Sequence, residues 1–484
     1  MSPPAIKQQI QVALGHYQAG RYLEADAIYR QLLNQAPNDP EIHTHLGNLV
    51  RDQGQLDEAI AFYRRASRLQ SEYAAAESNL LYTLYFHPDF DARAIFEEHR
   101  RWDRDHARPL ASAIQPHTNE RSCDRPLRIG YVSSHFRNHC QSFFTVPLLR
   151  CHDQTRLNVF CYANVPQPDS ITERLQSYAR AWRNTVETSD EEVARIIRAD
   201  QIDILVDLTM HMGGCRPLLF ARKPAPIQVA WLAYPGTTGL STMDYRITDP
   251  YLDPPGLDDA HYSEESIRLA DSFWCYDPLT GEPEVNTLPA RARGHVTFCC
   301  LNNFCKISRQ VLALWARVLQ EVEGSRLAIL AAPGPHREQT RQFFREKGIA
   351  GERLAFVVRR PRLEYLKLHH RLDVALDPFP YTGHTTTLDA LWMGVPVVTL
   401  AGRTAVSRGA KSILYNLGLS ELVAYTPEEY VSIATDLAKD LEQLQLLRHQ
   451  LRERMQQSAL VDAPRFARNM ECAYRTMWRR WCGS

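Results

Sequence analysis

The stretch that indicates the fold most clearly is residues 373–402, DVALDPFPYTGHTTTLDALWMGVPVVTLAG. A short apolar run, Val374–Leu376, predicts a buried strand, and a turn containing Gly383 comes after it. Residues Thr386–Met393 then predict a helix, and Val395–Leu400 predicts a second strand. A strand, a helix and a second strand in this order form a βαβ unit, so the stretch predicts a parallel sheet covered by helices.

The same alternation extends towards the N-terminus and predicts two α/β regions, at 126–276 and 295–484, with a linker at 277–294. The expected strands of the first region are Leu127–Ser133, Leu157–Tyr162, Ile202–Leu208 and Ile227–Leu232, with a helix at Val193–Ala199. The second region adds strands Val296–Cys300, Leu327–Leu330 and Leu354–Val358, and helices Ile307–Val322 and Leu363–Leu372. The fold class is therefore two doubly wound, Rossmann-like α/β domains in tandem. Ligands are expected beyond the carboxyl ends of the strands, in the cleft between the domains.

Residues 1–108 read as successive helices with a period of 34 residues. Across one period Gly20 recurs as Gly54, Ala25 as Ala59 and Tyr29 as Tyr63. Small residues let paired helices approach closely, and tyrosine rings fill the space between pairs. The pattern predicts α-helical tetratricopeptide-like repeats, two clear and one partial, with an ordinary helical bundle as the alternative. Such repeats predict partner binding, although so few can also only buttress the domains after them, and residues 109–125 predict a linker.

Charge and composition restrict the class of protein. The 484 residues include 56 basic and 56 acidic side chains, so the formal net charge is zero. A neutral chain argues against nucleic acid or a membrane surface as partner, because both need a basic face. No apolar run reaches the roughly 18–20 residues of a membrane span, and the first residues lack the apolar core of a secretory signal. Eleven cysteines without CxxC spacing favour reduced thiols, and the expected location is cytoplasmic.

The turn after strand Val374–Leu376 is the strongest candidate for chemistry. Amide groups and threonine hydroxyls at a helix start suit a diphosphate, and Asp389, one turn further on, suits ribose hydroxyls. Lys306 stands between a predicted strand and helix, where it can reach a phosphate. The alternatives are plain helix capping with His384 as an ordinary loop residue, and a solvated lysine.

Histidines come after two strands of the first α/β region. His135 and His139 come after Leu127–Ser133, and His211 comes after Ile202–Leu208. An imidazole near its ordinary pKa can take a proton from an acceptor hydroxyl, whereas each histidine alone can also be an ordinary hydrogen-bonded loop residue. The glycine turn 235–239 can bring backbone amides near a ligand.

Motifs of several other enzyme classes are absent from the sequence. There is no Walker lysine loop, no dinucleotide Gly-x-Gly-x-x-Gly and no Gly-x-Ser-x-Gly elbow, which argues against an NTPase, a dehydrogenase and an esterase. The two Asp-x-Asp pairs lie in the helical front end and are not preceded by a strand, so we expect no metal and no other cofactor. A phosphate-bearing donor held without metal favours a transferase.

These segments together resemble the O-GlcNAc transferase and SPINDLY family, which joins tetratricopeptide repeats to a two-lobed GT-B catalytic region. The resemblance rests on Leu127–His139, Ile204–Gly213, Ala225–Thr248, Asn302–Lys306 and Asp373–Gly402. It implies inverting, metal-independent transfer of a sugar from a nucleotide diphosphate to a Ser or Thr hydroxyl of a protein. The N-terminal lobe is expected on the acceptor side, and the C-terminal lobe is expected to bind the nucleotide sugar.

The resemblance also implies roles for single residues. Lys306 matches the lysine that neutralises the leaving diphosphate, and Asp389 matches the ribose contact. The phosphate-binding turn is matched by His384, Thr385 and Thr386. His139 matches the proposed general base, with His211 second. In the family an aspartate or a phosphate oxygen of the donor is the alternative base.

Two departures bear on the donor. Asn303 stands where uridine-binding members have Gln, and Tyr365 stands where they have His. UDP-GlcNAc is the favoured donor and GDP-fucose, as the SPINDLY resemblance suggests, is the alternative. Protein acceptors are expected as partners, with the repeats as a route to them. A non-catalytic scaffold, in which the repeats recruit a partner, is the more distant alternative.

Overall fold

In the computed structural model, residues 3–281 and 283–483 are described. The chain divides into two compact units, and each contains one parallel sheet. Unit 1 comprises Met1–Phe90, Thr280–Gly402 and Leu419–Arg454, whereas unit 2 comprises Asp91–Leu279, Arg403–Gly418 and Met455–Ser484.

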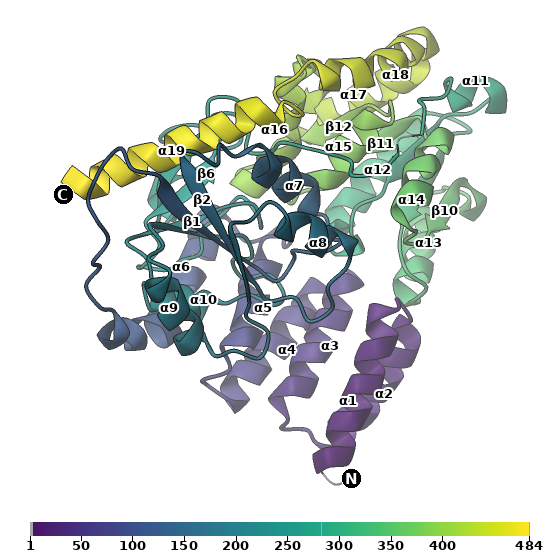
Figure 1. The fold of residues 1–484 in the computed structure, drawn as a ribbon. Coiled ribbons are helices and arrows are strands. Elements are labelled where there is room, and N and C mark those ends of the chain that lie inside the picture. The colour runs from purple at the N-terminus through teal and green to yellow at the C-terminus, as the bar shows by residue number, and fades with distance from the viewer. Residues whose placement is uncertain (1–2, 282, 484) are drawn as a thin grey trace. The chain divides into compact units, whose positions relative to one another are not determined.

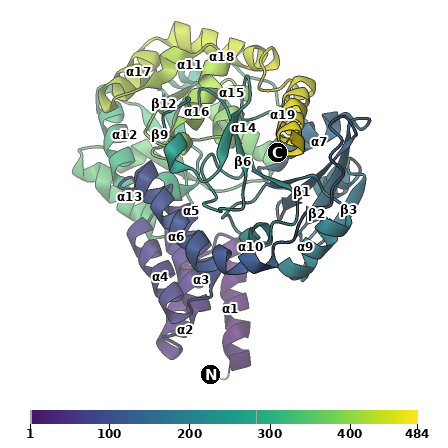
Figure 2. The same cartoon turned by 90° about the vertical axis from the view of Figure 1, so that its left-hand side faces the viewer.

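The N-terminal helices of unit 1 have the predicted repeat structure. They are α1 (Pro3–Gln18), α2 (Tyr22–Gln35), α3 (Pro40–Asp52), α4 (Leu56–Leu69) and α5 (Ala74–Leu84). Consecutive helices pack against one another and run side by side in both ribbon views (Figure 1, Figure 2). The equivalent residues Ala25 and Ala59 are both fully buried. Gly20 and Gly54 both take left-handed backbone angles, with φ of 72° and 80°, after α1 and α3. The 34-residue period is therefore a structural repeat.

The sheet of unit 1 has six parallel strands in the order β10-β9-β8-β11-β12-β13. The strands are β8 (Thr297–Cys300), β9 (Arg326–Leu330), β10 (Leu354–Val357), β11 (Val374–Leu376), β12 (Val397–Leu400) and β13 (Val423–Ala424). The helices of this part are α11 (Pro289–Arg293), α12 (Arg309–Glu321), α13 (Pro335–Glu346), α14 (Arg362–Leu368), α15 (Thr385–Trp392), α17 (Pro427–Lys439) and α18 (Leu441–Gln456). Helix α12 buries the apolar stripe expected from its sequence, including Val311, Trp315 and Val318, and Ser308 caps its first turn.

The sheet of unit 2 has seven parallel strands in the order β3-β2-β1-β4-β5-β6-β7. The strands are β1 (Leu127–Ser133), β2 (Leu157–Ala163), β3 (Ala181–Asn184), β4 (Ile204–Asp207), β5 (Ile227–Ala230), β6 (Tyr245–Thr248) and β7 (Glu265–Arg268). The helices are α6 (Ala92–Trp102), α7 (Ser142–Cys151), α8 (Ser170–Gln176), α9 (Asp190–Ala199), α10 (Pro217–Ala221), α16 (Gly409–Asn416) and α19 (Ala463–Gly483). The expected fold class, helical repeats before two doubly wound α/β sheets, is confirmed.

Two segments near the end of the chain pack with unit 2, although the sequence places them in the C-terminal lobe at 295–484. Ser412 of α16 donates a hydrogen bond to Asp249 at 2.7 Å. Helix α19, yellow in Figure 1, packs against α7 and β5, and its Phe466 ring contacts Trp231. The cause is tertiary packing: the apolar face of α19 packs against elements of the first sheet, and no local sequence pattern indicates which sheet a helix will cover.

Both sheets reverse their strand order at one point. In each, the first strand of the series (β1 or β8) lies between the second strand and the fourth, so connections leave it in opposite directions. At such a switch point the loops after the two central strands separate and leave room for a ligand. The residues singled out in the sequence come directly after these strands: β1 and β4 in unit 2, and β8 and β11 in unit 1.

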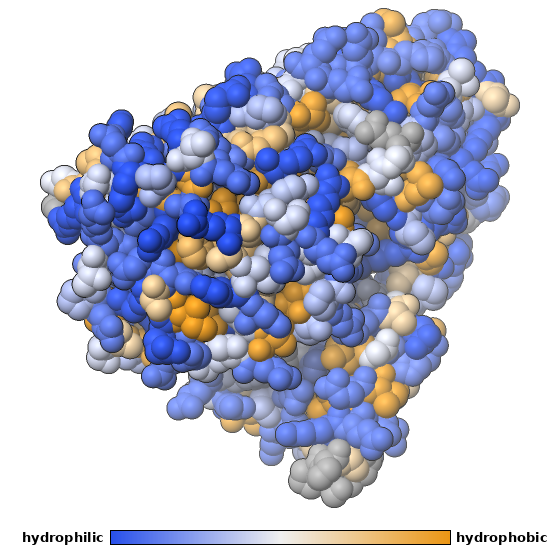
Figure 3. Space-filling model, viewed as in Figure 1, coloured by the Kyte–Doolittle hydropathy of each residue, from blue (hydrophilic) through white to orange (hydrophobic). Residues whose placement is uncertain are grey.

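Polar side chains dominate the face shown in Figure 3, where apolar residues form only small separate patches. Among the helices of residues 3–281 and 283–483, none is long and apolar enough to cross a membrane.

Candidate functional site

The turn after β11 is held from beneath by Asp377. Its carboxylate accepts a hydrogen bond from the Gly383 amide at 2.7 Å and another from the Thr399 hydroxyl at 2.8 Å. Burial raises the pKa of Asp377 to about 7, against the opposing effects of Thr399, Gly383 and the charge of Lys306. Asp377 therefore fixes the path of the chain into α15.

Gly383 has no room for a side chain. A Cβ atom there would lie 2.5 Å from the Thr387 hydroxyl oxygen, 2.7 Å from that of Thr386 and 2.8 Å from Asp377 Oδ1. Contacts below about 3.0 Å force neighbouring atoms to move, so the tight turn depends on glycine at this position. The next helix begins at Thr385, and no side chain of the described residues caps it at the His384 position.

Lys306 meets this turn from the neighbouring strand. A short 3-10 turn, Phe304–Lys306, comes after β8 and presents the ammonium group towards the β11 loop. Nζ donates to the Thr382 carbonyl at 2.8 Å and to Asn302 Oδ1 at 3.2 Å, and it lies 4.2 Å from the Tyr381 ring centre. The Thr386 hydroxyl donates to the same Asn302 oxygen at 2.9 Å. The structure thus brings together the two candidate features, the lysine and the turn, that the sequence suggested separately.

The other candidate residues of this lobe lie around the same loops. Asp389 is buried and accepts two hydrogen bonds from the guanidinium of Arg362, at 2.6 and 2.8 Å. Asn303 accepts a hydrogen bond from Arg359 at 2.8 Å, and the His384 ring lies 5.1 Å from that of Tyr381. Sequence reasoning missed Arg362 and Asn302. Asn302 stands within the quoted Asn302–Lys306 segment, whereas nothing in the sequence links Arg362 to a carboxylate 27 residues away.

In unit 2 the structure brings His135 and His139 together after β1. Their rings stack with centres 4.0 Å apart and an angle of 17°. His135 is buried, which lowers its pKa to about 4 together with the nearby charge of Arg137. His139 is half-buried, and its Nδ1 accepts a hydrogen bond from the Gln141 amide at 3.3 Å. In the neutral ring the lone pair is therefore on Nδ1 of His139.

His211 lies in a different environment. Its side chain has no exposed surface, and its Nε2 donates to the Thr238 carbonyl at 2.8 Å. The rings of His99 and Trp102 pack edge-on against it, at 5.3 and 5.0 Å. Burial lowers the pKa of His211 to about 4, so the ring is neutral at pH 7. The structure gives this histidine the surroundings of a packed structural residue that fastens the glycine turn 235–239.

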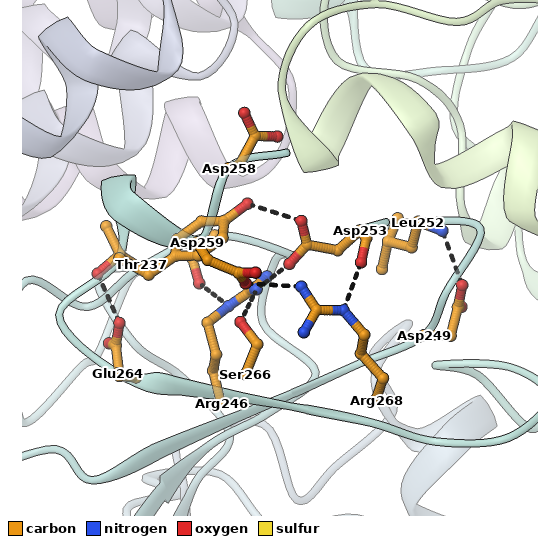
Figure 4. Close-up of polar contacts among 12 residues, drawn as sticks. Thr237, Arg246, Asp249, Leu252, Asp253, Asp258, Asp259, Glu264, Ser266 and Arg268 are labelled. Carbon is orange, nitrogen blue, oxygen red and sulfur yellow. Dashed lines mark hydrogen bonds and ion pairs between the residues drawn. The ribbon is translucent and has the colours of Figure 1, made fainter. Parts of the chain in front are cut away.

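The glycine turn is also held by Arg246 of β6 and by Glu264, the residue before β7, and Figure 4 shows the contact of Thr237 with Glu264. The buried carboxylate of Glu264 accepts from the Thr237 hydroxyl at 2.6 Å and from the Thr238 amide at 2.6 Å. Arg246 donates to the Gly236 carbonyl at 3.0 Å and forms a buried ion pair with Asp253. Neither support is visible in the sequence, because Glu264 and Arg246 read as ordinary surface charges.

The backbone just before this turn is strained. Leu232 comes after β5 with φ of 80°, a left-handed angle that branched and bulky residues rarely adopt, and the Ala233 amide bonds back to the Trp231 carbonyl. Met210, after the neighbouring strand β4, has φ of 47°. Strain of this kind gathers where the surrounding structure imposes a particular loop shape.

Helical repeats joined to two Rossmann-like sheets, with the candidate residues at the switch points of the sheets, form an architecture of the glycosyltransferase type. The sequence profile of glycosyl transferase family 41 matches residues 77–281 and 284–470, and a tetratricopeptide repeat profile matches residues 16–80. The chain therefore belongs to glycosyl transferase family 41, and the resemblance seen in the sequence is confirmed.

Two similar proteins and one solved structure agree with this assignment. A Hordeum vulgare protein named probable UDP-N-acetylglucosamine–peptide N-acetylglucosaminyltransferase SPINDLY is 38% identical over 419 residues, or 84% of this chain and 44% of that protein. The Caenorhabditis elegans UDP-N-acetylglucosamine–peptide N-acetylglucosaminyltransferase is 27% identical over 498 residues, or 78% and 43%. A mutant of the Thermobaculum terrenum O-GlcNAc transferase has a TM-score of 0.93 at 36% identity, covering 100% of this chain and 92% of that one. The chain spans less than half the length of the Hordeum vulgare and Caenorhabditis elegans proteins.

Proposed function

We propose that the chain is an inverting protein O-glycosyltransferase that moves GlcNAc from UDP-GlcNAc to Ser or Thr hydroxyls without a metal ion. One observation carries the proposal: Lys306, Asn302 and Thr386 converge where the β8 and β11 loops meet. A cation beside a helix start is suited to a diphosphate that gains negative charge as it leaves. The relatives named above, whose printed names give UDP-N-acetylglucosamine and peptide as substrates, support the same assignment.

In this mechanism His139 takes the proton of the acceptor hydroxyl on Nδ1, after this nitrogen exchanges its hydrogen bond from the Gln141 amide for one from the hydroxyl. The hydroxyl oxygen forms a bond to the anomeric carbon while the bond from that carbon to the diphosphate oxygen breaks. The electron pair leaves with the nucleotide diphosphate, where Lys306 and the start of α15 stabilise it. Stacking on the neutral His135 ring orients the His139 ring for this role.

The test of the donor site is binding of UDP and GDP, with and without magnesium, measured by thermal shift and calorimetry. We expect one nucleotide to stabilise the protein without metal, and Lys306→Ala to abolish the effect. Lys367→Ala is the matched control, because Lys367 is an exposed lysine of the same unit that pairs with Glu364. If Lys306→Ala binds nucleotide and turns over donor as the wild type does, the site is assigned wrongly.

The test of the base is turnover of a Ser/Thr peptide by His139→Gln with saturating donor. General-base catalysis is typically worth 10²–10⁴ in rate, so we expect a loss of at least about a hundredfold with nucleotide binding unchanged. A loss below about tenfold with an intact fold assigns the base elsewhere, to an aspartate or to a donor phosphate oxygen.

A second candidate donor is GDP-fucose, transferred by the same chemistry. Tyr365 favours it: this tyrosine replaces the histidine expected in uridine-binding members, and its hydroxyl is buried without a hydrogen-bond partner among the described residues. Donor hydrolysis across a panel of nucleotide sugars separates the two. If no nucleotide sugar is bound or turned over, the alternative that the repeats recruit a partner and the lobes act as a scaffold gains support.

A further inference from the structure

A cavity of about 340 Å³ lies on one face of the unit 1 sheet, between the strands β8–β10 and the segment that includes α14. Its apolar wall includes the buried residues Leu301, Leu368 and Leu372. Ligand pockets typically measure roughly 300–1,000 Å³, so this hollow is at the size of a small organic molecule.

The cavity exists because two small residues lie side by side. Ala328 of β9 and Ala355 of β10 are register partners, so their side chains stand next to each other on the same face. Arg326, two residues before Ala328 in β9, is the register partner of Thr297 in β8. Because side chains alternate along a strand, the side chains of this pair lie on the same face of the sheet as the two alanines. Larger side chains at 328 and 355 would fill the hollow, which the alanines leave open.

The rim of the cavity has one sign of charge. The residues that line it include His295 and no acidic residue. They also include four exposed arginines, which are Arg293, Arg326, Arg360 and Arg371. Across residues 3–281 and 283–483, none of these four guanidinium groups forms an ion pair. Arg293 is fixed at the rim by a hydrogen bond to the Arg371 carbonyl at 2.9 Å. In a chain with zero net charge, four arginines around one apolar hollow create a local attraction for anions.

We propose that this cavity binds a small organic anion, whose apolar body fills the hollow and whose carboxylate, sulfonate or phosphate lies among the arginines. Guanidinium groups bind such groups through paired hydrogen bonds, and the apolar wall favours a pair of rings or a short acyl chain over a bare ion. None of the lining residues belongs to the turn after β11. The lining includes Thr297 and Arg326, the first residues of β8 and β9, and extends to Leu301 and Arg360 after the carboxyl ends of β8 and β10.

The probe is 8-anilinonaphthalene-1-sulfonate, titrated into the full chain by fluorescence and calorimetry at low and high salt. We expect one saturable site whose affinity falls as salt rises. Arg326→Gln with Arg371→Gln should weaken binding at least tenfold. The matched control is Arg156→Gln with Arg468→Gln, two exposed arginines of unit 2, which should leave the affinity unchanged.

A second variant separates shape from charge. Ala355→Leu keeps all four arginines but narrows the hollow, and Ala355 is exposed on an edge strand, so the fold should tolerate it. We expect this variant also to bind the probe more weakly, with its melting temperature unchanged. Equal probe affinity in wild type and both cavity variants would overturn the proposal. Displacement of the probe by UDP or GDP at one equivalent would also overturn it, because the cavity would then belong to the nucleotide site.

Discussion

Replacement of Gly383 by alanine tests most directly whether the proposed nucleotide site needs the tight turn after β11. The added methyl group would lie 2.5–2.8 Å from three oxygens, on Thr387, Thr386 and Asp377. Two of them cannot move without loss of a hydrogen bond: the Thr386 hydroxyl donates to Asn302, and Asp377 accepts from the Gly383 amide itself. Overpacking a close-packed site costs about 1–3 kcal/mol, and each displaced hydrogen bond adds about 0.5–1.5 kcal/mol.

The expected result comes from these magnitudes. About 2–4 kcal/mol of strain lowers the melting temperature by several degrees, since roughly 1 kcal/mol shifts it by about 2–4 °C in domains of this size. Part of the strain is relieved by opening the turn, so nucleotide affinity should fall at least about tenfold. The assays are a thermal melt and calorimetric titration of the preferred nucleotide. Gly351→Ala is the matched control, because a Cβ at Gly351 meets no atom within 4 Å. If Gly383→Ala and Gly351→Ala melt and bind alike, the turn does not depend on close approach and the reasoning fails.

Three further predictions concern the supports of the site. Glu264→Gln should lower the free energy of unfolding by about 1–3 kcal/mol in urea denaturation. One carboxylate oxygen of Glu264 accepts from the Thr237 hydroxyl and the other from the Thr238 amide, whereas glutamine has only one accepting oxygen. An unchanged urea midpoint would contradict a supporting role for Glu264. The raised pKa of Asp377 means that the folded state binds more protons than the unfolded state between about pH 4 and 7, so its contribution is present at low pH and is lost as pH rises through 7. Relative to Asp377→Asn, the wild type should lose about 3 kcal/mol from about pH 4.5 to about pH 7.5, and parallel pH curves would refute this. His211→Phe should lower the melting temperature, because the ring is buried and donates a hydrogen bond to Thr238. Peptide turnover per folded molecule should fall less than about tenfold. A roughly hundredfold loss of turnover at an unchanged melting temperature would instead assign the general base to His211.

Much of this fold could be predicted because the signals are local. The 34-residue period rests on small residues that recur in sequence, and strands such as Ile204–Asp207 are buried on both faces and therefore read as continuous apolar runs. Strand β6 was missed because Arg246 interrupts its apolar pattern. That arginine is buried against Asp253 and the Tyr262 ring, and no local sequence pattern indicates that these side chains meet.

The candidate site divides in the same way. Gly383, the threonines after it and Lys306 could be singled out because they occupy positions at strand ends, and strand ends are visible in the sequence. The partners of these residues could not be predicted from the sequence. Arg362 pairs with Asp389, and His211 packs between His99 and Trp102, through contacts that only the folded chain creates. Burial also separates His211 from His139, although both come after strands in similar sequence surroundings.

The packing of α19 on unit 2 has a consequence for biosynthesis. The strands of that sheet are complete at residue 268, yet the helix that covers α7 and β5 begins only at residue 463. At roughly 5–20 residues per second, a ribosome needs roughly 10–40 s to make the intervening segment. During that interval the nascent first sheet exposes the apolar surface that Phe466 and its neighbours later bury, so chaperone capture is expected in this window.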